Sequence, residues 1–498
     1  MRLILKHKVE IILLSVLLLA YFALRLPNLT LQPIFADEAI YVRWAQVMKS
    51  EPTLRFLPLS DGKTPLFMWV LMPLFKVFED PLFAGRFLSV MSGLVTLLGV
   101  YFLSRKVFNS KVAFWASLIY VVSPYTVFFD RMALVDSMLS AFTVWIIYFV
   151  ILLSEKVRLD LAMILGFLMG GAWLTKTPAL VNLLILPVSI IAFKNLKDTK
   201  RFLKLFLLWS VAVLIAFTMY NALRLGPNFH LLSSRNSDYI FSITELLPRP
   251  LDPFIPHLRD IMDWFPKLLT YPILVFWGMG VYFLIKSKNK LAYVVFLWAL
   301  LPLLLNMTFL RTFTARYLLP SIAPMFIFAG FGLVSILNRV KTTNMAKNLI
   351  SAILILPLAL YFNYQLLTSP PPDNMPLEGR IGYFEEWTAG YGFKEIASFL
   401  EEKSKKESVV VGTEGFFGTL PDGLQIYLDK ANVKFVGSHA TISAQIRQAA
   451  RDNLTYFVGN KARVEGRIDN VIFVKEYLKA KPSLGRKQDA IVIYQVLP

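Results

Sequence analysis

The sequence predicts a polytopic α-helical membrane protein with a small extramembrane α/β domain at its C-terminal end. Of the 498 residues, 56% are hydrophobic and only 17% are charged, and the mean hydropathy is +0.56. These values lie outside the range of ordinary globular chains. Apolar runs of roughly 20 residues, each long enough to cross a bilayer core as a helix, recur between residues 11 and 367. The remainder of the chain lacks such runs.

Apolar length and flanking charge predict transmembrane helices, about 11 to 13 in all. The segments are 9–26, 84–104, 112–129, 133–153, 159–175, 178–193, 202–223, 267–285, 291–310, 314–338 and 348–367. The segment 66–78 is too short to span and contains Pro73 and Lys76, so we expect it at the membrane interface. No small-residue cleavage site follows the first run, which predicts a retained helix rather than a signal peptide.

The connecting segments predict the topology. Those rich in Lys and Arg are MRLILKHK, SRKVFNSK, SEKVRLD, FKNLKDTKRFLK, KSKNK and NRVKTTNMAK. By the positive-inside rule they are cytoplasmic, so an odd number of crossings places residues from about 370 onward outside. We expect a multi-pass protein of the cell (plasma) membrane with a cytoplasmic N-terminus and an external C-terminal domain. These loops also account for the formal charge of +19, so no nucleic-acid partner is expected.

Composition divides the chain into a transmembrane domain (1–368), a linker (369–379) and an external domain (380–498). The transmembrane domain contains a first external loop (27–83) and a large external loop (224–266). The linker contains the Pro-rich sequence SPPPDNMP, which cannot continue a helix. After it, predicted strands at 409–413, 433–437, 454–459 and 490–497 are interleaved with helical patterns at 393–403 and 442–451, which favours an α/β domain.

Polar residues gather on the predicted external face near helix ends. They are Asp37, Glu38, Tyr41, Arg43, Asp61, Lys63, Arg86, Asp130, Arg131, Asp136, Lys176, Arg311, Arg316 and Tyr317. Charges near membrane depth are costly and mark ligand or ion paths, although each could instead snorkel or form a local ion pair. Asp130, Arg131 and Asp136 could also pair with one another across a tight turn.

The balance of these charges suggests a chemistry. The cations Lys63, Arg86, Arg131, Lys176, Arg311 and Arg316 could neutralise a phosphate, while Asp37 could accept a proton. A sugar on a lipid phosphate needs a base for the acceptor hydroxyl and cations for the departing phosphate. One acidic pair facing many cations favours a single base over two-acid hydrolysis, and predicts inversion at the anomeric carbon.

Six motifs occur in order on the predicted external face. They are Asp37-Glu38, the Lys-x-Pro-Leu segment at Lys63, GRFLSVMSGL with Arg86, RMALVD with Arg131 and Asp136, TKxP with Lys176, and RYLLP with Arg316 and Tyr317. With them the chain resembles the GT-C superfamily of polyprenyl-phosphate-sugar glycosyltransferases over most of residues 1–367. The resemblance is to the bacterial or archaeal protein O-mannosyltransferase and lipid A aminoarabinose transferase branch.

The resemblance implies a GT-C fold, with Asp37 as catalytic base and Glu38 orienting the loop. It implies that Lys63, Arg86, Lys176 and Arg316 surround the donor phosphate and sugar, in a wider set with Tyr41, Arg43, Arg131, Asp136, Arg311 and Tyr317. The implied donor is a hexose or pentose on undecaprenyl or dolichyl phosphate. The implied acceptor is a protein or glycolipid outside the lipid bilayer. The segment EEWTAGYGFKEIASFL resembles the start of the soluble domain that many bacterial members append.

Some family features are missing. The aminoarabinose branch resembles enzymes with an external-loop His near a metal, but His230 and His257 lie in no motif that aligns. No cofactor is required by the chemistry, and no motif supports a divalent metal. A Trp-Trp-Asp signature is absent, which argues against an oligosaccharyltransferase, and the lectin module of eukaryotic protein mannosyltransferases is absent too.

A transporter or flippase of lipid-linked sugars is the alternative function. Transporters place charges near mid-bilayer on broken helices and often show a repeat between halves. Here the charges crowd one face and no internal repeat is visible, which favours the enzyme. The donor sugar and the acceptor stay open at this stage.

Overall fold

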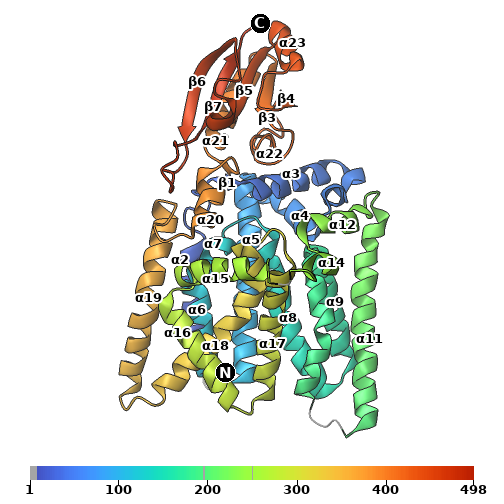
Figure 1. Cartoon of the computed structure of the whole chain (residues 1–498), viewed down its shortest axis with the longest axis vertical. Helices are drawn as coiled ribbons and strands as arrows, with labels where there is room; N and C mark the ends of the chain where they lie inside the picture. Colours follow the sequence, from blue (N-terminus) through green and yellow to red (C-terminus); the bar gives the residue numbers. More distant parts are fainter. Residues whose placement is uncertain (1–7, 194–196, 250) are drawn as a thin grey trace.

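A computed structural model describes residues 8–193, 197–249 and 251–498. Residues 1–7 and 194–196, which belong to two of the predicted cytoplasmic loops, lie outside the described residues. A helical bundle forms most of the molecule, and the C-terminal domain lies on one end of it (Figure 1). The connection between the two helices before the linker lies at the opposite end (Figure 1).

Each of the eleven predicted spans contains helix. The elements are α2 (Lys8–Arg25), α5 (Pro81–Val107), α6 (Ser110–Val122), α7 (Pro124–Asp130), α8 (Val135–Lys156), α9 (Leu159–Thr175), α10 (Val181–Leu184), α11 (Thr199–Asn221), α16 (Tyr271–Lys286), α17 (Lys290–Phe309), α18 (Leu319–Leu337) and α19 (Asn344–Thr368). Within the described ranges, six helices are long and apolar enough to cross a membrane, or up to eight if each of two bent pairs is one span. The polytopic helical class is thereby confirmed. The other predicted spans, including α9 and 177–192, are shorter or more charged helices.

Proline breaks three of the spans that the sequence pattern predicts as continuous. The span 112–129 bends by 59° between α6 and α7, where Pro124 begins the second helix. The span 178–193 consists of short 3₁₀ turns on either side of α10, with Pro178 and Pro187 near their starts. The span 267–285 begins later, at α16, after a bend of 114°. Proline lacks the amide donor and clashes with the preceding turn, so hydropathy alone overestimates helix continuity.

The two loops predicted to be external contain short elements. They are β1 (Ile34–Phe35), α3 (Ala36–Ser50), α4 (Leu66–Leu71), α12 (Leu231–Ser234), α13 (Asn236–Tyr239), α14 (Ile243–Leu246) and α15 (Phe254–Leu268). All of them lie at the end of the bundle that carries the C-terminal domain (Figure 1). The predicted interfacial segment is α4 followed by a 3₁₀ turn over Met72–Lys76, too short to span.

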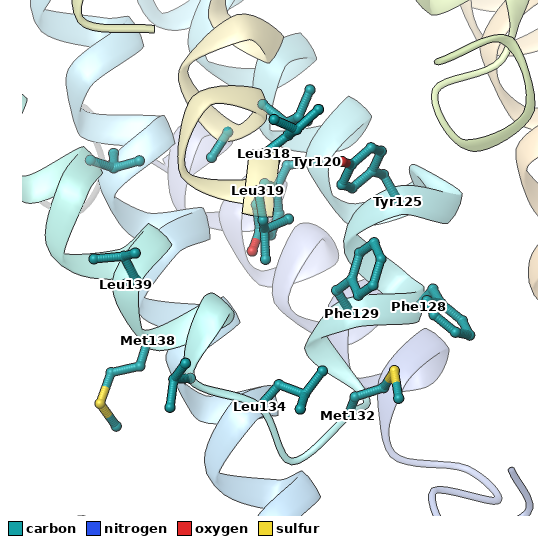
Figure 2. Close-up of a cluster of buried hydrophobic side chains, with 14 of the residues drawn as sticks. Tyr120, Tyr125, Phe128, Phe129, Met132, Leu134, Met138, Leu139, Leu318 and Leu319 are labelled. Carbon is teal, nitrogen blue, oxygen red and sulfur yellow. The ribbon is translucent and has the colours of Figure 1, made fainter. Parts of the chain in front are cut away.

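The core of the bundle lies where α7 and α8 meet the start of α18. Figure 2 shows Tyr125, Phe128 and Phe129 of this region beside Leu318 and Leu319. These side chains are at most 2% exposed. Their burial fixes the turn between α7 and α8 against the chain that follows Arg316. The apolar packing therefore determines where the polar ends of these helices lie.

The C-terminal domain is a three-layer α/β unit. Its elements are α20 (Leu377–Arg380), β2 (Ala389–Gly390), α21 (Phe393–Ser404), β3 (Val409–Glu414), α22 (Asp422–Gln425), β4 (Val433–Ser438), α23 (Ala444–Asp452), β5 (Leu454–Asn460), α24 (Lys461–Val464), β6 (Val471–Leu478) and β7 (Ala490–Val496). The sheet order is β4-β3-β5-β7-β6, with β3, β4 and β5 parallel and β6 and β7 antiparallel.

Alternate residues of the sheet face different helices. Val458 belongs to the same buried cluster as Leu400 of α21, whereas Phe457 belongs to a separate cluster with Ile446 of α23. The four predicted strands and two predicted helices of this domain are present. The sequence analysis missed β6, because the charged residues of VIFVKEYL interrupt its apolar pattern.

Candidate functional site

The site is a group of charged side chains at the end of the bundle that faces the C-terminal domain. Arg316 Nη2 lies 2.6 Å from Asp37 Oδ2, and Lys63 Nζ lies 3.6 Å from Asp37 Oδ1. Lys63 also contacts Asp61 at 3.3 Å, and its ammonium lies 5.2 Å from the centre of the Tyr41 ring. Two cations from separate elements therefore share one carboxylate.

A second pair adjoins the first. Lys176 Nζ lies 2.6 Å from Asp136 Oδ1, and 3.8 Å from the centre of the Tyr317 ring. Because Arg316 lies 5.1 Å from the same ring, Tyr317 separates the two cations. We call Asp37, Lys63, Asp136, Lys176 and Arg316 the charged cluster.

The cations of the charged cluster are reachable from solvent. Their side chains are 11% to 23% exposed, as is Asp37 at 20%. A bound anion could replace the carboxylates as their partner without unfolding the bundle. The geometry suits a group that carries negative charge, such as a phosphate.

Local sequence explains how Asp37 is presented. It occupies the first turn of α3, where the helix dipole favours a carboxylate. One residue later, Glu38 Oε2 accepts a hydrogen bond of 3.0 Å from the Phe35 amide, which closes the start of the helix. Two adjacent acids thus have different roles: one faces the cations and one fixes the helix.

The ionisation of Asp37 is set by its neighbours. Burial alone would raise the pKa of Asp37, but the positive charges of Arg316 and Lys63 outweigh burial and hold the pKa well below its ordinary value. For Lys63 burial acts in the other direction and lowers the pKa. The neighbouring Tyr41 and Asp37 outweigh burial, so the pKa of Lys63 lies above its ordinary value. Asp37 is therefore a weak base while both cations remain paired with its carboxylate.

Arg86, which the sequence predicts to contact the donor phosphate, lies outside the charged cluster. Arg86 is fully buried, donates from Nε and Nη2 to Glu38 at 2.8 Å, and donates its other hydrogens to the carbonyls of Leu29, Gln32 and Pro33. Glu38 Oε1 also accepts from the Ala133 amide at 2.7 Å. The pair joins the first external loop to α5 and the turn before α8. The expectation that Glu38 orients the loop fits this arrangement.

Arg131 is also absent from the charged cluster. It is fully buried and donates to the carbonyls of Arg25, Pro27 and Asn28, so it anchors the end of α2. Asp130 does not pair with it but with the buried Arg25 at 3.0 Å. The sequence analysis missed Arg25, because a cation at the end of a hydrophobic helix is also what snorkelling predicts.

Two further predicted residues have partners elsewhere. Arg43 lies 2.5 Å from Asp429 in the C-terminal domain. Arg311 lies 2.5 Å from Glu245 and stacks over the Phe241 ring at 4.4 Å. Neither side chain joins the charged cluster.

The structure adds residues that the sequence did not indicate. Arg235 of the large loop lies 2.6 Å from Asp61, so this loop reaches the charged cluster. Beside Arg316 a narrow pocket is lined by Phe128, Phe129, Leu268, Ala315, Met375, Pro376, Glu378, Gly379 and Tyr383. Glu378 is exposed to solvent and lines this pocket.

Glu378 differs from Asp37 in its charge environment. Burial and repulsion from Asp260 raise the pKa of Glu378 to about 7, and Arg316 opposes this only in part. The one sequence signal for this residue was a carboxylate two positions after the Pro-rich sequence SPPPDNMP, within the predicted linker.

The two histidines of the large loop do not form a metal site with their neighbours. His257 Nδ1 lies 2.7 Å from the Met307 carbonyl oxygen, and its ring stacks on Phe313. Across the part of the chain that the structure describes, no group of three or more His, Cys, Asp or Glu residues could hold a metal ion.

Comparison with known proteins agrees with this architecture. Residues 62–222 match the dolichyl-phosphate-mannose-protein mannosyltransferase family. No curated protein matches the chain.

Two solved structures share the fold. One is ArnT from Cupriavidus metallidurans bound to undecaprenyl phosphate, which is 15% identical, with 98% of each chain covered and a TM-score of 0.60. The other is the archaeal oligosaccharyltransferase AglB from Archaeoglobus fulgidus in complex with an inhibitory peptide and a dolichol-phosphate. It is 12% identical, with 91% of this chain and 70% of that chain covered and a TM-score of 0.52. At these identities the likeness shows the fold.

Proposed function

We propose that this chain, a membrane glycosyltransferase of the GT-C superfamily, transfers a sugar from a polyprenyl phosphate to an acceptor outside the membrane. The proposed donor lipid is undecaprenyl or dolichyl phosphate, and the proposed acceptor is a protein or glycolipid. The observation that carries the proposal is that Arg316 and Lys63 both form ion pairs with the carboxylate of Asp37. A carboxylate and several reachable cations are the groups that such a transfer needs.

The neighbouring structures support the choice of ligands. ArnT was solved with undecaprenyl phosphate, and AglB with a dolichol-phosphate and a peptide. The matching family is named for a dolichyl-phosphate-linked donor and a protein acceptor. A lipid phosphate is the chemistry common to all three, and the charged cluster has cations suited to bind it.

The low pKa of Asp37 suggests how donor and base are coupled. When a phosphate enters, Lys63 and Arg316 can turn from Asp37 to the phosphate oxygens, because both side chains are partly exposed. Losing these neighbours raises the pKa of Asp37 and makes it a better base. Donor binding would thereby activate the residue that deprotonates the acceptor.

The proposed reaction is a single displacement. The acceptor oxygen forms a bond to the anomeric carbon while the bond from that carbon to the phosphate oxygen breaks. The acceptor proton passes to Asp37, and the polyprenyl phosphate leaves with the electron pair, held by Lys63, Lys176 and Arg316. Attack opposite the leaving group inverts the anomeric carbon.

We propose that the charged cluster faces the exterior. The basic connections predicted to be cytoplasmic include the one between α18 and α19, which lies at the end of the bundle away from α3, the helix that contains Asp37 (Figure 1). Since the C-terminal domain shares an end with the charged cluster, it is external in the same proposal. A flippase or transporter has less support, because the charges gather at one end instead of mid-bilayer.

A release assay tests the function. Purified protein in detergent is incubated with a panel of radiolabelled polyprenyl-phosphate sugars, with and without crude membranes as acceptor, and free polyprenyl phosphate is measured. We expect turnover of one donor by the parent and none by Asp37→Asn. No release from any donor under either condition would contradict the proposal and favour transport, for which a flipping assay is the next measurement.

A further inference from the structure

Helix α3 has three faces with different neighbours. Residues three and four apart share a face of an α-helix, and each residue adds about 100° of rotation. The first face carries Asp37, Tyr41 and Trp44. Lys63 contacts all three: the carboxylate at 3.6 Å and the two ring centres at 5.2 and 5.7 Å. This face belongs to the charged cluster.

The second face packs on the transmembrane bundle. Glu38 forms its buried pair with Arg86, and Val42 lies so close to Gly85 that a Cβ added there would come within 2.9 Å of the valine. Both partners are on α5, so this face joins α3 to a membrane helix.

The third face, opposite the charged cluster, packs on the C-terminal domain. Arg43 contacts Asp429 at 2.5 Å, and Gln46 Nε2 donates to the Ile426 carbonyl at 2.8 Å. Ala39 lies against Gly423, where an added Cβ would approach it within 3.7 Å. The C-terminal domain therefore contacts the same helix that presents Asp37.

A main-chain connection reinforces this contact where α3 begins. Strand β1 pairs antiparallel with β2, with Ile34 opposite Gly390 and Phe35 opposite Ala389. The next amide, that of Ala36, donates to the Thr388 carbonyl at 3.0 Å. These hydrogen bonds end one residue before Asp37.

We propose that the C-terminal domain positions the catalytic carboxylate, through the β1–β2 pairing and the Arg43–Asp429 contact. The proposal rests on the proposed function, in which Asp37 is the base. Thr388, Gly390 and Asp429 touch neither donor nor acceptor in it and act through α3. The phosphate-binding cations belong to other elements, so a shift of α3 should slow transfer without weakening phosphate binding.

A matched pair of glycine variants tests this separation. A Cβ added at Gly390 would meet Phe393 at 2.3 Å and Ile34 at 2.7 Å, whereas one added at Gly382, eight positions earlier in the same segment, meets nothing within 4 Å. We expect Gly390→Ala to lower kcat about ten-fold or more, as a misplacement of about 1 Å can. Gly382→Ala should match the parent. Affinity for undecaprenyl phosphate should not weaken in either variant, because the cations that bind the phosphate stay in place.

Exchanging the charges of the Arg43–Asp429 pair tests whether restoring the contact restores kcat. Arg43→Glu places two acids together and should lower kcat, and adding Asp429→Lys should restore it. The control pair is Lys394–Asp80, at 2.8 Å, which joins the C-terminal domain to the start of α5 and not to α3. Lys394→Ala should leave kcat unchanged.

Amide hydrogen exchange gives a readout that does not need turnover. In Gly390→Ala the amides of residues 36–40 should exchange faster than in Gly382→Ala, while those of α5 stay the same. If kcat is equal in the two glycine variants although the amides of Gly390→Ala exchange faster, the C-terminal domain does not position Asp37. Equal exchange at residues 36–40 in the two variants would overturn the proposal as well. Absence of turnover in the parent itself would instead contradict the proposed function, and the exchange result would still decide whether the domain holds α3.

Discussion

Arg316 donates to Asp37 across 2.6 Å, and the tyrosine that follows Arg316 stacks with Lys176. Residues 316–317 therefore connect a carboxylate of the first external loop with a cation that follows α9. No other contact in the charged cluster spans as much of the sequence. This contact makes the ionisation of Asp37 and the binding of an anion compete for the same cation.

Asp37→Asn should abolish transfer and at the same time tighten binding of undecaprenyl phosphate. The amide keeps the volume but neither accepts a proton nor holds Arg316 and Lys63, so both cations become free for phosphate. Transfer is measured by release of polyprenyl phosphate, and binding by ligand-dependent thermal shift. Glu245→Gln, which removes an acid that pairs with Arg311 and Ser242 outside the charged cluster, is the control and should leave both unchanged. Retained transfer in Asp37→Asn would exclude it as the base.

Lys63→Ala and Arg316→Ala should each weaken undecaprenyl phosphate binding about ten-fold or more and leave a slow residual rate. Loss of one hydrogen bond to a charged group costs about 1.5 to 3 kcal/mol, which corresponds to that change in affinity. Arg311→Ala is the control, since its guanidinium pairs with Glu245 outside the charged cluster. If the Michaelis constant for the donor is unchanged in both variants, these residues do not hold the phosphate.

Arg86→Ala should destabilise the fold and not act on phosphate binding directly. It leaves Glu38 as a buried, unpaired charge, which costs about 3 to 5 kcal/mol. The unfolding midpoint in detergent should fall well below that of the parent. Arg158→Ala breaks an exposed pair with Asp160, which solvent screens, and should leave the midpoint close to that of the parent. Equal midpoints for the two variants would show that the Glu38 pair contributes little to stability.

Glu378 should make stability depend on pH. Its pKa is raised to about 7 from an ordinary value of 4.5, so the folded protein binds this proton more tightly than the unfolded chain does. The stabilising contribution is complete below about pH 4.5 and is lost as pH rises through about 7. Glu378→Gln cannot lose a proton, so its unfolding midpoint should decline less than the parent's over that range. Parallel midpoint curves for the two proteins would mean that Glu378 is not perturbed.

Much of the architecture follows from the sequence. Hydropathy located helix in each predicted span, and β-branched runs located four of the five strands in the domain's sheet. Helix continuity was overestimated at Pro124 and Pro187, because mean hydropathy does not register a missing amide donor. Strand β6 was missed because an edge strand with exposed charges lacks the buried pattern that identifies its neighbours.

The site was predicted less completely, for a physical reason. Sequence order places cations at one membrane face, but it cannot distinguish a cation reachable by ligand from one enclosed by carbonyl groups. Arg86 and Arg316 look equivalent in their motifs, yet one is fully buried with Glu38 and the other is partly exposed beside Asp37. Asp61 gains its partner Arg235 only because the large loop folds back over the first.

The three faces of α3 constrain its length more strictly than its composition. Insertion of a single residue between Asp37 and Arg43 would rotate the rest of the helix by about 100° and advance it by about 1.5 Å. Arg43 would then leave Asp429, and Tyr41 would leave Lys63, although every side chain would still be present. Related chains should therefore vary in sequence along α3 far more readily than in the number of residues that it contains.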